Sequence, residues 1–237
     1  MTRIRLPLKR TVFFLAAFAF SLVALIPLRV AVAWFGGQGL AAREAEGSIW
    51  LGMLKEARLG PVPLGDVRAR LNMLPLLLGR ARLSLSRDAS DGHFEGAVSV
   101  SRHSFGLEDM TGQFRTGTLF APVPISALDL EGVSIRFDDG RCESAEGRVR
   151  ATASGEVAGI PVPSGLAGDA RCAEGALLLP LAGQAGIGQL NLFIRADGGY
   201  RIDLIVRQAD PALVPRLAAA GFQPSAEGYS RRIEGHF

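Results

Sequence analysis

The sequence predicts a mainly β fold: an N-terminal transmembrane helix, then a predominantly antiparallel, twisted β domain, with one short helix near the C-terminus. Three observations predict it. Residues 11–28 form a run of 18 residues without a charged side chain. All 29 glycines follow Ala33, a distribution typical of many short strands and turns in that part of the chain. There, apolar residues recur mainly with period two, which indicates strands with one buried face.

The uncharged run is long enough to anchor the protein in a membrane. At about 1.5 Å per residue it gives roughly 27 Å of helix, close to the thickness of the hydrocarbon core of a bilayer. The basic residues before it outnumber the single Arg29 after it, and they are Arg3, Arg5, Lys9 and Arg10. This asymmetry predicts a cytoplasmic N-terminus and a translocated remainder. We expect a cytoplasmic basic segment at 1–10, an anchor at 11–35 that Pro27 kinks, and a linker at 36–46.

A cleaved signal peptide is the alternative for this segment. Ala31-Val32-Ala33 fits a small-residue cleavage pattern, and a signal peptide would have the same basic start. The uncharged run exceeds the roughly 7 to 15 apolar residues of a typical signal peptide, which favours the anchor.

The apolar pattern of the remaining chain predicts about eleven strands. Residues of one parity are apolar in each of four clear examples: Leu83 and Leu85; Phe94, Val98 and Val100; Leu190, Leu192 and Ile194; Ile202, Leu204 and Val206. A stretch rich in glycine, proline and serine after Pro161 divides a first β module at 47–160 from a second at 161–237, which completes the same domain. The alternation of apolar residues is the same in a closed sandwich and in an open groove, so the sequence is compatible with both. A closed core is the favoured interpretation.

Local signals predict the turns and the short helices. The apolar parity changes across Glu131-Gly132, which predicts a β-bulge, and Asp197-Gly198 predicts a hairpin turn. Gly65-Asp66 predicts another hairpin, whose second strand points Val67, Ala69 and Leu71 inward. Residues 72–78 are consistent with one helical turn between Pro75 and Gly79. Near the C-terminus, Asp210-Pro211 and Gly221 suit the start and the end of a short helix, with Pro215 as an alternative first residue.

Charge and composition exclude several classes of function. The net charge of +3 comes from the N-terminal 33 residues, and the rest of the chain carries 21 basic against 23 acidic residues. A nucleic-acid partner is therefore not expected. The three histidines, His93, His103 and His236, have no metal-ligand spacing, and no nucleophile and base form a recognisable motif. We expect no enzyme activity, no cofactor and no metal site.

The two cysteines, Cys142 and Cys172, both lie in the part that is expected to be translocated. An oxidising compartment would permit a disulfide between them, which the chain-entropy account values at about 3 kcal/mol. Two separate buried thiols are the alternative, which a cytosolic protein would prefer.

Several segments, in their order and spacing, resemble the family of type II secretion system protein N. They are Gly47-Ser48-Ile49-Trp50-Leu51-Gly52, Pro63-Leu64-Gly65-Asp66-Val67-Arg68, Pro75-Leu76-Leu77-Leu78-Gly79-Arg80, Ala220-Gly221-Phe222 and Glu227-Gly228-Tyr229. Cys142 and Cys172 match the family's spaced cysteines. The residues themselves suit structural roles: Gly47 and Gly52 admit turns or bulges around Trp50, a side chain large enough to anchor a β core.

The resemblance implies a non-enzymatic protein of the inner membrane with a periplasmic β domain. It would sit beside the inner-membrane platform that exports folded proteins across the outer membrane, with other type II secretion subunits as partners. A second resemblance, to bridge-like bacterial lipid-transport proteins, rests on the anchored one-faced strands and the Pro-Leu-Leu-Leu-Gly-Arg segment. It implies an anchored β-groove that binds or transfers lipid between membranes, and lipid is then the alternative partner.

Overall fold

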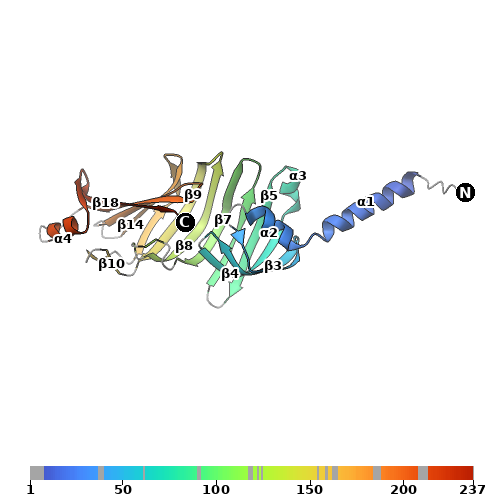
Figure 1. Cartoon of the computed structure of the whole chain (residues 1–237), viewed down its shortest axis with the longest axis horizontal. Helices are drawn as coiled ribbons and strands as arrows, with labels where there is room; N and C mark the ends of the chain where they lie inside the picture. The colour runs from blue at the N-terminus through green and yellow to red at the C-terminus, as the bar shows by residue number, and fades with distance from the viewer. Residues whose placement is uncertain are drawn as a thin grey trace, which may run out of the picture.

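In the computed structural model of the protein, antiparallel strands form most of the chain (Figure 1). The structure describes residues 8–36, 40–60, 62–89, 92–116, 120–121, 123, 125–153, 155–157, 160–161, 165–183, 188–207 and 213–236. The helices are α1 (Leu8–Ala24), α2 (Leu28–Gly36), α3 (Met73–Leu77) and α4 (Val214–Ala219). The strands are β1 (Leu40–Ala41), β2 (Glu44–Ser48), β3 (Leu51–Leu59), β4 (Val62–Leu71), β5 (Ala81–Ala89), β6 (Gly92–Val100), β7 (Ser104–Arg115), β8 (Ile125–Asp138), β9 (Arg141–Ala153), β10 (Glu156–Val157), β11 (Ile160–Pro161), β12 (Gly165–Asp169), β13 (Arg171–Ala173), β14 (Ala176–Gly183), β15 (Gly188–Ile194), β16 (Gly199–Val206), β17 (Gln223–Ser225) and β18 (Gly228–His236).

One sheet contains 16 of these strands, and its main path follows the order of the chain closely. The path is β1-β3-β4-β5-β6-β7-β8-β9-β12-β14-β15-β16-β18-β17, with β2 also paired to β3 and β13 also paired to β14. β10 and β11 form a separate pair. Since β9 pairs with β12, the sheet continues past residue 160, where the sequence suggested a change of module. The prediction of a mainly antiparallel β fold is confirmed.

The predicted alternation of side chains is also found, and its apolar side is the core. Leu83 in β5, Leu192 in β15 and Ile202 in β16 have no exposed surface at all. They belong to one cluster of buried side chains that extends along the sheet. Because no water-sized space adjoins these three side chains, protein atoms fill the apolar face there, as in a close-packed core. This packing favours the closed core over the open groove.

A row of irregular positions, which we call the crease, crosses the middle of the sheet from β6 to β12. On β6, a Cβ added to Gly96 would strike Met110 of β7, and Met110 pairs with Val133 of β8. On β9, Gly147 lies against the backbone of Val133. The Gly147 carbonyl accepts the N–H of Ala170, which follows β12. The ladders of β6–β7, β7–β8 and β8–β9 all shift register along this row. The bulge predicted at Glu131-Gly132 is confirmed as part of it.

The crease explains how one sheet can cover its own apolar face. A bulge increases local twist and bends its strand, so aligned bulges curl a sheet. Other elements complete the cover. Phe120, in the connection between β7 and β8, is buried, and its ring centroid lies 6.4 Å from that of Tyr200 in β16. Leu28 of α2 and Leu217 of α4 are fully buried, and Figure 1 shows these helices toward opposite ends of the sheet.

The anchor predicted as one helix over 11–35 is wrong in its extent. The helix ends at Ala24, and Pro27, which cannot donate a backbone hydrogen bond, instead forms an isolated β-bridge with Ser48. Residues 28–36 then form α2, which packs on the sheet through Leu28. In the part of the chain that the structure describes, no helix has both the length and the apolar character to cross a bilayer. Arg3 and Arg5 lie outside the described residues.

The hairpin predicted at Gly65-Asp66 is also wrong, although the inward residues after it are confirmed. Gly65 and Asp66 lie inside β4, at a bulge opposite β3, where the Asp66 carboxylate accepts the N–H of Glu56 at 3.0 Å. Gly65 has φ +73, a conformation that serves a bulge as readily as a turn. Val67, Ala69 and Leu71 are all buried, as expected.

The predicted hairpin at Asp197-Gly198 joins β15 to β16. The Asp197 carboxylate accepts the Gly199 N–H at 2.8 Å, and this bond, aided by Arg195, lowers the pKa of Asp197 below its ordinary value near 3.8. A carboxyl whose pKa is lower in the folded state stabilises the fold above its unfolded pKa, and this contribution disappears as pH falls through the folded pKa. We expect NMR titration of the full chain to place the Asp197 midpoint below 3.8. As the pH is lowered from 4, an Asp197→Asn variant should lose less stability than the parent. A titration midpoint of Asp197 at its ordinary value would contradict the hydrogen bond to Gly199.

The predicted C-terminal helix is present as α4. It starts at Val214, so Pro215 is its second residue, and Asp210-Pro211 lies outside the described residues. Gly221 follows the helix with φ +81, which agrees with its expected role at the helix end. The helical turn expected within 72–78 is α3.

Candidate functional site

The two ends of the sheet differ in how their edges are covered. At the first end, β1 and β2 lie outside β3, and the chain before them closes over this edge. Pro27 bridges Ser48, and the Ile49 N–H donates to the Ile26 carbonyl at 3.0 Å. Ser48 and Ile49 at this edge are therefore engaged by the preceding chain, and α2 contacts both β1 and β2.

The other end of the sheet leaves much of an edge strand accessible. β18 pairs with β16 along its length, from Tyr229 to His236. On its other side β17 pairs only with residues 228–230. In the described part of the chain, no strand pairs with the outer side of residues 231–235, which we call the open edge.

The geometry of the β17–β18 hairpin shows which backbone groups face outward. Ser225 and Gly228 close a two-residue turn, so they form a hydrogen-bonded pair, and Pro224, which has no N–H, lies opposite Tyr229 at a non-hydrogen-bonded position. Successive residues of a strand direct their backbone groups to opposite sides, so the even-numbered residues of β18 point away from β16. Arg232 and Glu234 therefore present their N–H and C=O groups at the open edge.

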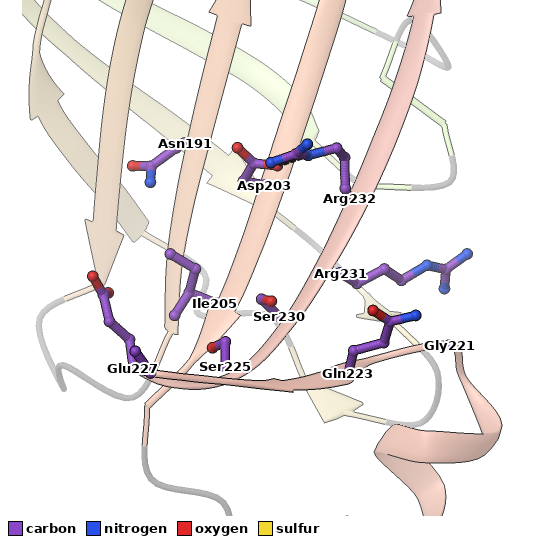
Figure 2. Close-up of a pocket in the computed structure, with 11 residues that line it drawn as sticks. Asn191, Asp203, Ile205, Gly221, Gln223, Ser225, Glu227, Ser230, Arg231 and Arg232 are labelled. Atoms are coloured by element: carbon purple, nitrogen blue, oxygen red, sulfur yellow. Dashed lines mark hydrogen bonds and ion pairs between the residues drawn. The ribbon is translucent and has the colours of Figure 1, made fainter.

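Charged side chains surround this edge on the outer face of the sheet. Arg232 donates through Nε to Asp203 at 2.9 Å (Figure 2). Arg201 Nε lies 3.3 Å from the other carboxylate oxygen of Asp203. The hydrogen bond to Asp203, and then the Asp203 charge, raise the pKa of Arg232 above its ordinary value. The Arg201 guanidinium also lies 3.9 Å from the centre of the Phe193 ring. The Glu234 side chain is exposed to solvent.

A polar cavity of about 650 Å³ lies beside these residues, between β17 and the outer face of β15 and β16 (Figure 2). Its lining includes Asn191, Asp203, Gln223, Ser230 and Arg231. The lining residues offer hydrogen bonds and charge, but they contain no nucleophile paired with a base. In the described ranges, no three histidine, cysteine, aspartate or glutamate side chains come together as a metal site.

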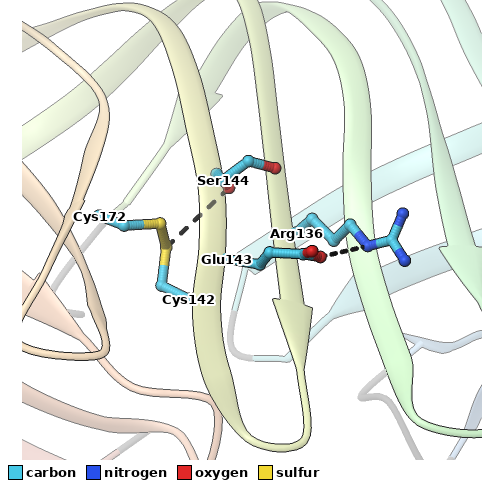
Figure 3. Close-up of a disulfide and its surroundings, with 5 residues drawn as sticks. All are labelled: Arg136, Cys142, Glu143, Ser144 and Cys172. Carbon is cyan, nitrogen blue, oxygen red and sulfur yellow. Dashed lines mark hydrogen bonds and ion pairs between the residues drawn. A yellow bond between two sulfur atoms is a disulfide. The ribbon is translucent and has the colours of Figure 1, made fainter.

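The structure brings Cys142 and Cys172 together as a disulfide. Their Cα atoms are 5.5 Å apart, and the bond connects β9 to β13 (Figure 3). The Cys142 N–H donates to the Gly175 carbonyl in the β13–β14 turn at 2.8 Å, so the backbone is joined at the same place. β12 and β13 are short, and the disulfide lies where these short strands connect the two halves of the sheet.

The other predicted residues do not meet in one site. Gly47 pairs with Gly52 in the β2–β3 hairpin, which carries the half-buried Trp50 at its turn. At the same end of the sheet, Gly79 follows α3 with φ +73. The residues from the end of the sequence lie at the opposite end of the sheet. Phe222 is buried after α4, Gly221 lies against the Arg231 side chain, and Gly228 and Tyr229 begin β18, where they pair with β17. Lys9 and Arg10 are in the first turn of α1.

One protein family matches most of the chain. The family described as "Type II secretion system (T2SS), protein N" matches residues 38–232. The chain belongs to this family. No curated protein and no solved structure gives a significant match.

The type II secretion system protein N match covers most of the sheet. It begins just before β1, contains both cysteines, and ends within β18 at the open edge. Membership makes the chain a component of the type II secretion system, whose work requires association with other subunits of that system. The open edge itself was missed by sequence reasoning, because β18 has few apolar residues and its exposure depends on how short β17 is.

Proposed function

We propose that this protein is a non-enzymatic scaffold of the type II secretion system. The N-terminal segment that includes α1 holds it at the inner membrane, with the N-terminus in the cytoplasm. The β domain then lies in the periplasm beside the inner-membrane platform. In this arrangement the sheet presents a docking surface to other secretion subunits during export of folded proteins.

The exposed surface of α1 supports the membrane placement. Phe13, Phe14, Leu15, Phe18 and Leu22 are each more than half exposed, and α1 projects from the end of the sheet (Figure 1). Apolar side chains on so many sides of a helix are costly in water and favourable in lipid. The disulfide agrees with an oxidising periplasm.

The open edge of β18 is the observation that carries the docking role. An extended segment of another subunit can add to a sheet by hydrogen bonding with free backbone groups of an edge strand. Arg232 and Glu234 supply such groups, with alternate charges on the outer face to select the register of the added strand. The covered edge at β1 and β2 makes the open edge the better candidate for strand addition.

A proline substitution tests this role without removing the internal ladder. Glu234→Pro removes an N–H that points outward, and proline is tolerated on an edge strand when its N–H faces away from the sheet. Glu234→Ala removes the same side chain but keeps the backbone donor, so it is the matched control. Each variant should accumulate in a deletion strain to the same protein level as the parent, and the thermal unfolding of each should match the parent.

We expect the deletion strain to retain an exported enzyme in the periplasm while its outer membrane stays intact. Complementation by the parent or by Glu234→Ala should restore secretion, whereas complementation by Glu234→Pro should not. Normal secretion with Glu234→Pro would contradict docking at the open edge. Normal secretion in the deletion strain would contradict the secretion role, and a leaky or lipid-altered outer membrane there would favour lipid transport.

A further inference from the structure

Large apolar side chains are exposed at only one end of the described molecule. Apart from those on α1, they are Leu25, Leu51, Met53, Met73, Leu74 and Leu78. In the part of the chain that the structure describes, no large apolar side chain after Leu78 is exposed to this extent. Leu74 and Leu78 are the extremes, with 79% and 87% of their surface exposed. A cluster of this kind on a protein surface marks a partner or a membrane.

Backbone hydrogen bonds hold these residues near the base of α1. The Ile49 N–H donates to the Ile26 carbonyl at 3.0 Å, and the Leu71 N–H donates to the Ile49 carbonyl at 2.8 Å. The end of α1, the β2–β3 turn and the start of α3 are therefore adjacent. Figure 1 shows α3 at the same end of the sheet as the base of α1.

The local structure at α3 directs Leu74, and Leu78 at the end of the helix, outward. Residues 73–78 are all apolar, and α3 supplies a single helical turn before the chain returns at Gly79. Leu74 and Leu78 are four residues apart, so they share one face of that turn, while Leu76 packs against the core. Leu74 and Leu78 are therefore exposed although the neighbouring Leu76 packs against the core.

Exposed basic residues flank these apolar segments in the sequence. Arg29 follows Leu28, Arg70 precedes α3, Arg80 follows Gly79, and all three side chains are exposed. Arginine at the rim of an apolar surface can extend its charged group to anionic lipid head groups and is attracted to them. Apolar and basic residues together fit the interfacial layer of a bilayer better than a soluble apolar ligand.

We propose that Leu25, Leu51, Met73, Leu74 and Leu78, which we call the apolar foot, insert into the interfacial layer of the bilayer that holds α1. This inference rests on the membrane placement in the proposed function and adds a second contact, made by the β domain itself. Continuity with the exposed surface of α1 identifies the occupant as lipid. Two contacts fix the orientation of the domain, where a single helix would leave it free to rotate.

The proposed orientation also sets the position of the open edge. β1 to β4 lie near the foot, and β16 to β18 lie at the far end of the main path of the sheet. At about 4.8 Å between strands, fourteen strands span roughly 60 Å along the curve of the sheet. The foot would therefore hold the open edge away from the bilayer surface, where a periplasmic partner can reach it.

Site-directed fluorescence tests the foot in the full chain. The disulfide occupies both native cysteines, so one introduced cysteine provides a single labelling site under non-reducing conditions. Leu74→Cys and Leu78→Cys report on the foot, Phe14→Cys reports on α1, and Ser225→Cys in β17 is the exposed control at the far end. Each would carry an environment-sensitive dye in vesicles of phosphatidylethanolamine and phosphatidylglycerol, with and without brominated acyl chains.

We expect bromine to quench the dye at Leu74 and Leu78 to an extent comparable with Phe14, and to leave Ser225 unchanged. Quenching at Phe14 without quenching at Leu74 and Leu78 would overturn the foot and leave the membrane placement intact. No quenching at any of the three would overturn both. Quenching at Ser225 equal to that at Leu74 would also overturn the proposed orientation, because the two ends of the sheet would then contact lipid alike.

Discussion

Replacing Gly147 by alanine is expected to destabilise the fold by about 2 to 5 kcal/mol, because backbone strain and overpacking would act together. Gly147 has φ +100, which L-residues rarely adopt. An added Cβ would lie 2.5 Å from the Gly132 carbonyl oxygen and 2.6 Å from the Val133 Cα. Both contacts are with backbone in the crease, so a side-chain rotation cannot relieve them. Denaturant unfolding of the full chain in detergent measures the loss.

Two other glycines provide matched controls for Gly147→Ala. Gly132 lies across the ladder at φ +58, and a Cβ there would meet no atom within 4 Å. Gly132→Ala should therefore cost only the backbone term, about 1 to 2 kcal/mol. Gly165 has open space and no positive φ, so Gly165→Ala should be close to neutral. Equal losses for Gly147→Ala and Gly132→Ala would show that the close approach in the crease is absent.

Removing the disulfide is expected to have a comparable effect. The bond closes a loop with a sequence separation of 30, and the chain-entropy account gives about 3.6 kcal/mol for a loop of this size. A Cys142→Ser, Cys172→Ser double variant should therefore unfold at markedly lower denaturant concentration. Hydrogen exchange should be accelerated first in β12 and β13, because few backbone bonds hold these short strands.

Chemical reduction provides the control for the disulfide. The reduced parent and the double variant should lose similar stability, since both lack the covalent connection. If the reduced parent keeps the stability of the oxidised protein, the bond contributes nothing. If the double variant alone is destabilised, the loss comes from replacing the half-buried sulfur atoms and not from the cross-link.

Short-range patterns of the sequence were sufficient for much of the fold. Period-two alternation placed Leu83 and Leu192 on the buried face, because a strand with one buried face imposes that period directly. The bulge at Glu131-Gly132 was visible as a change of parity within one strand. The family was visible in the order of several short segments, although each of them has a structural role and none forms a site.

Other features depend on partners that a single segment does not reveal. Gly65 has the positive φ of a turn and of a bulge alike, and only its pairing with β3 distinguishes the two. Pro27 suggested a kink within an anchor, but whether a proline bends or ends a helix depends on what receives the following residues, here the sheet. The open edge of β18 exists because β17 is short. The crease needs the registers of several adjacent strands, so no local pattern could predict it.

The nearly sequential order of the strands has a consequence for how the chain folds. From β3 to β9, each strand pairs with the strand that precedes it in the chain, so its partner is already present when it is released N-terminus first. Successive hairpins can then form by closing short loops, which is fast. Each new strand edge is therefore unpaired only briefly. The growing edge moves toward the C-terminus, and β18 is the last of the described strands to be released. The strand that completes the sheet thus carries the edge that we propose begins assembly.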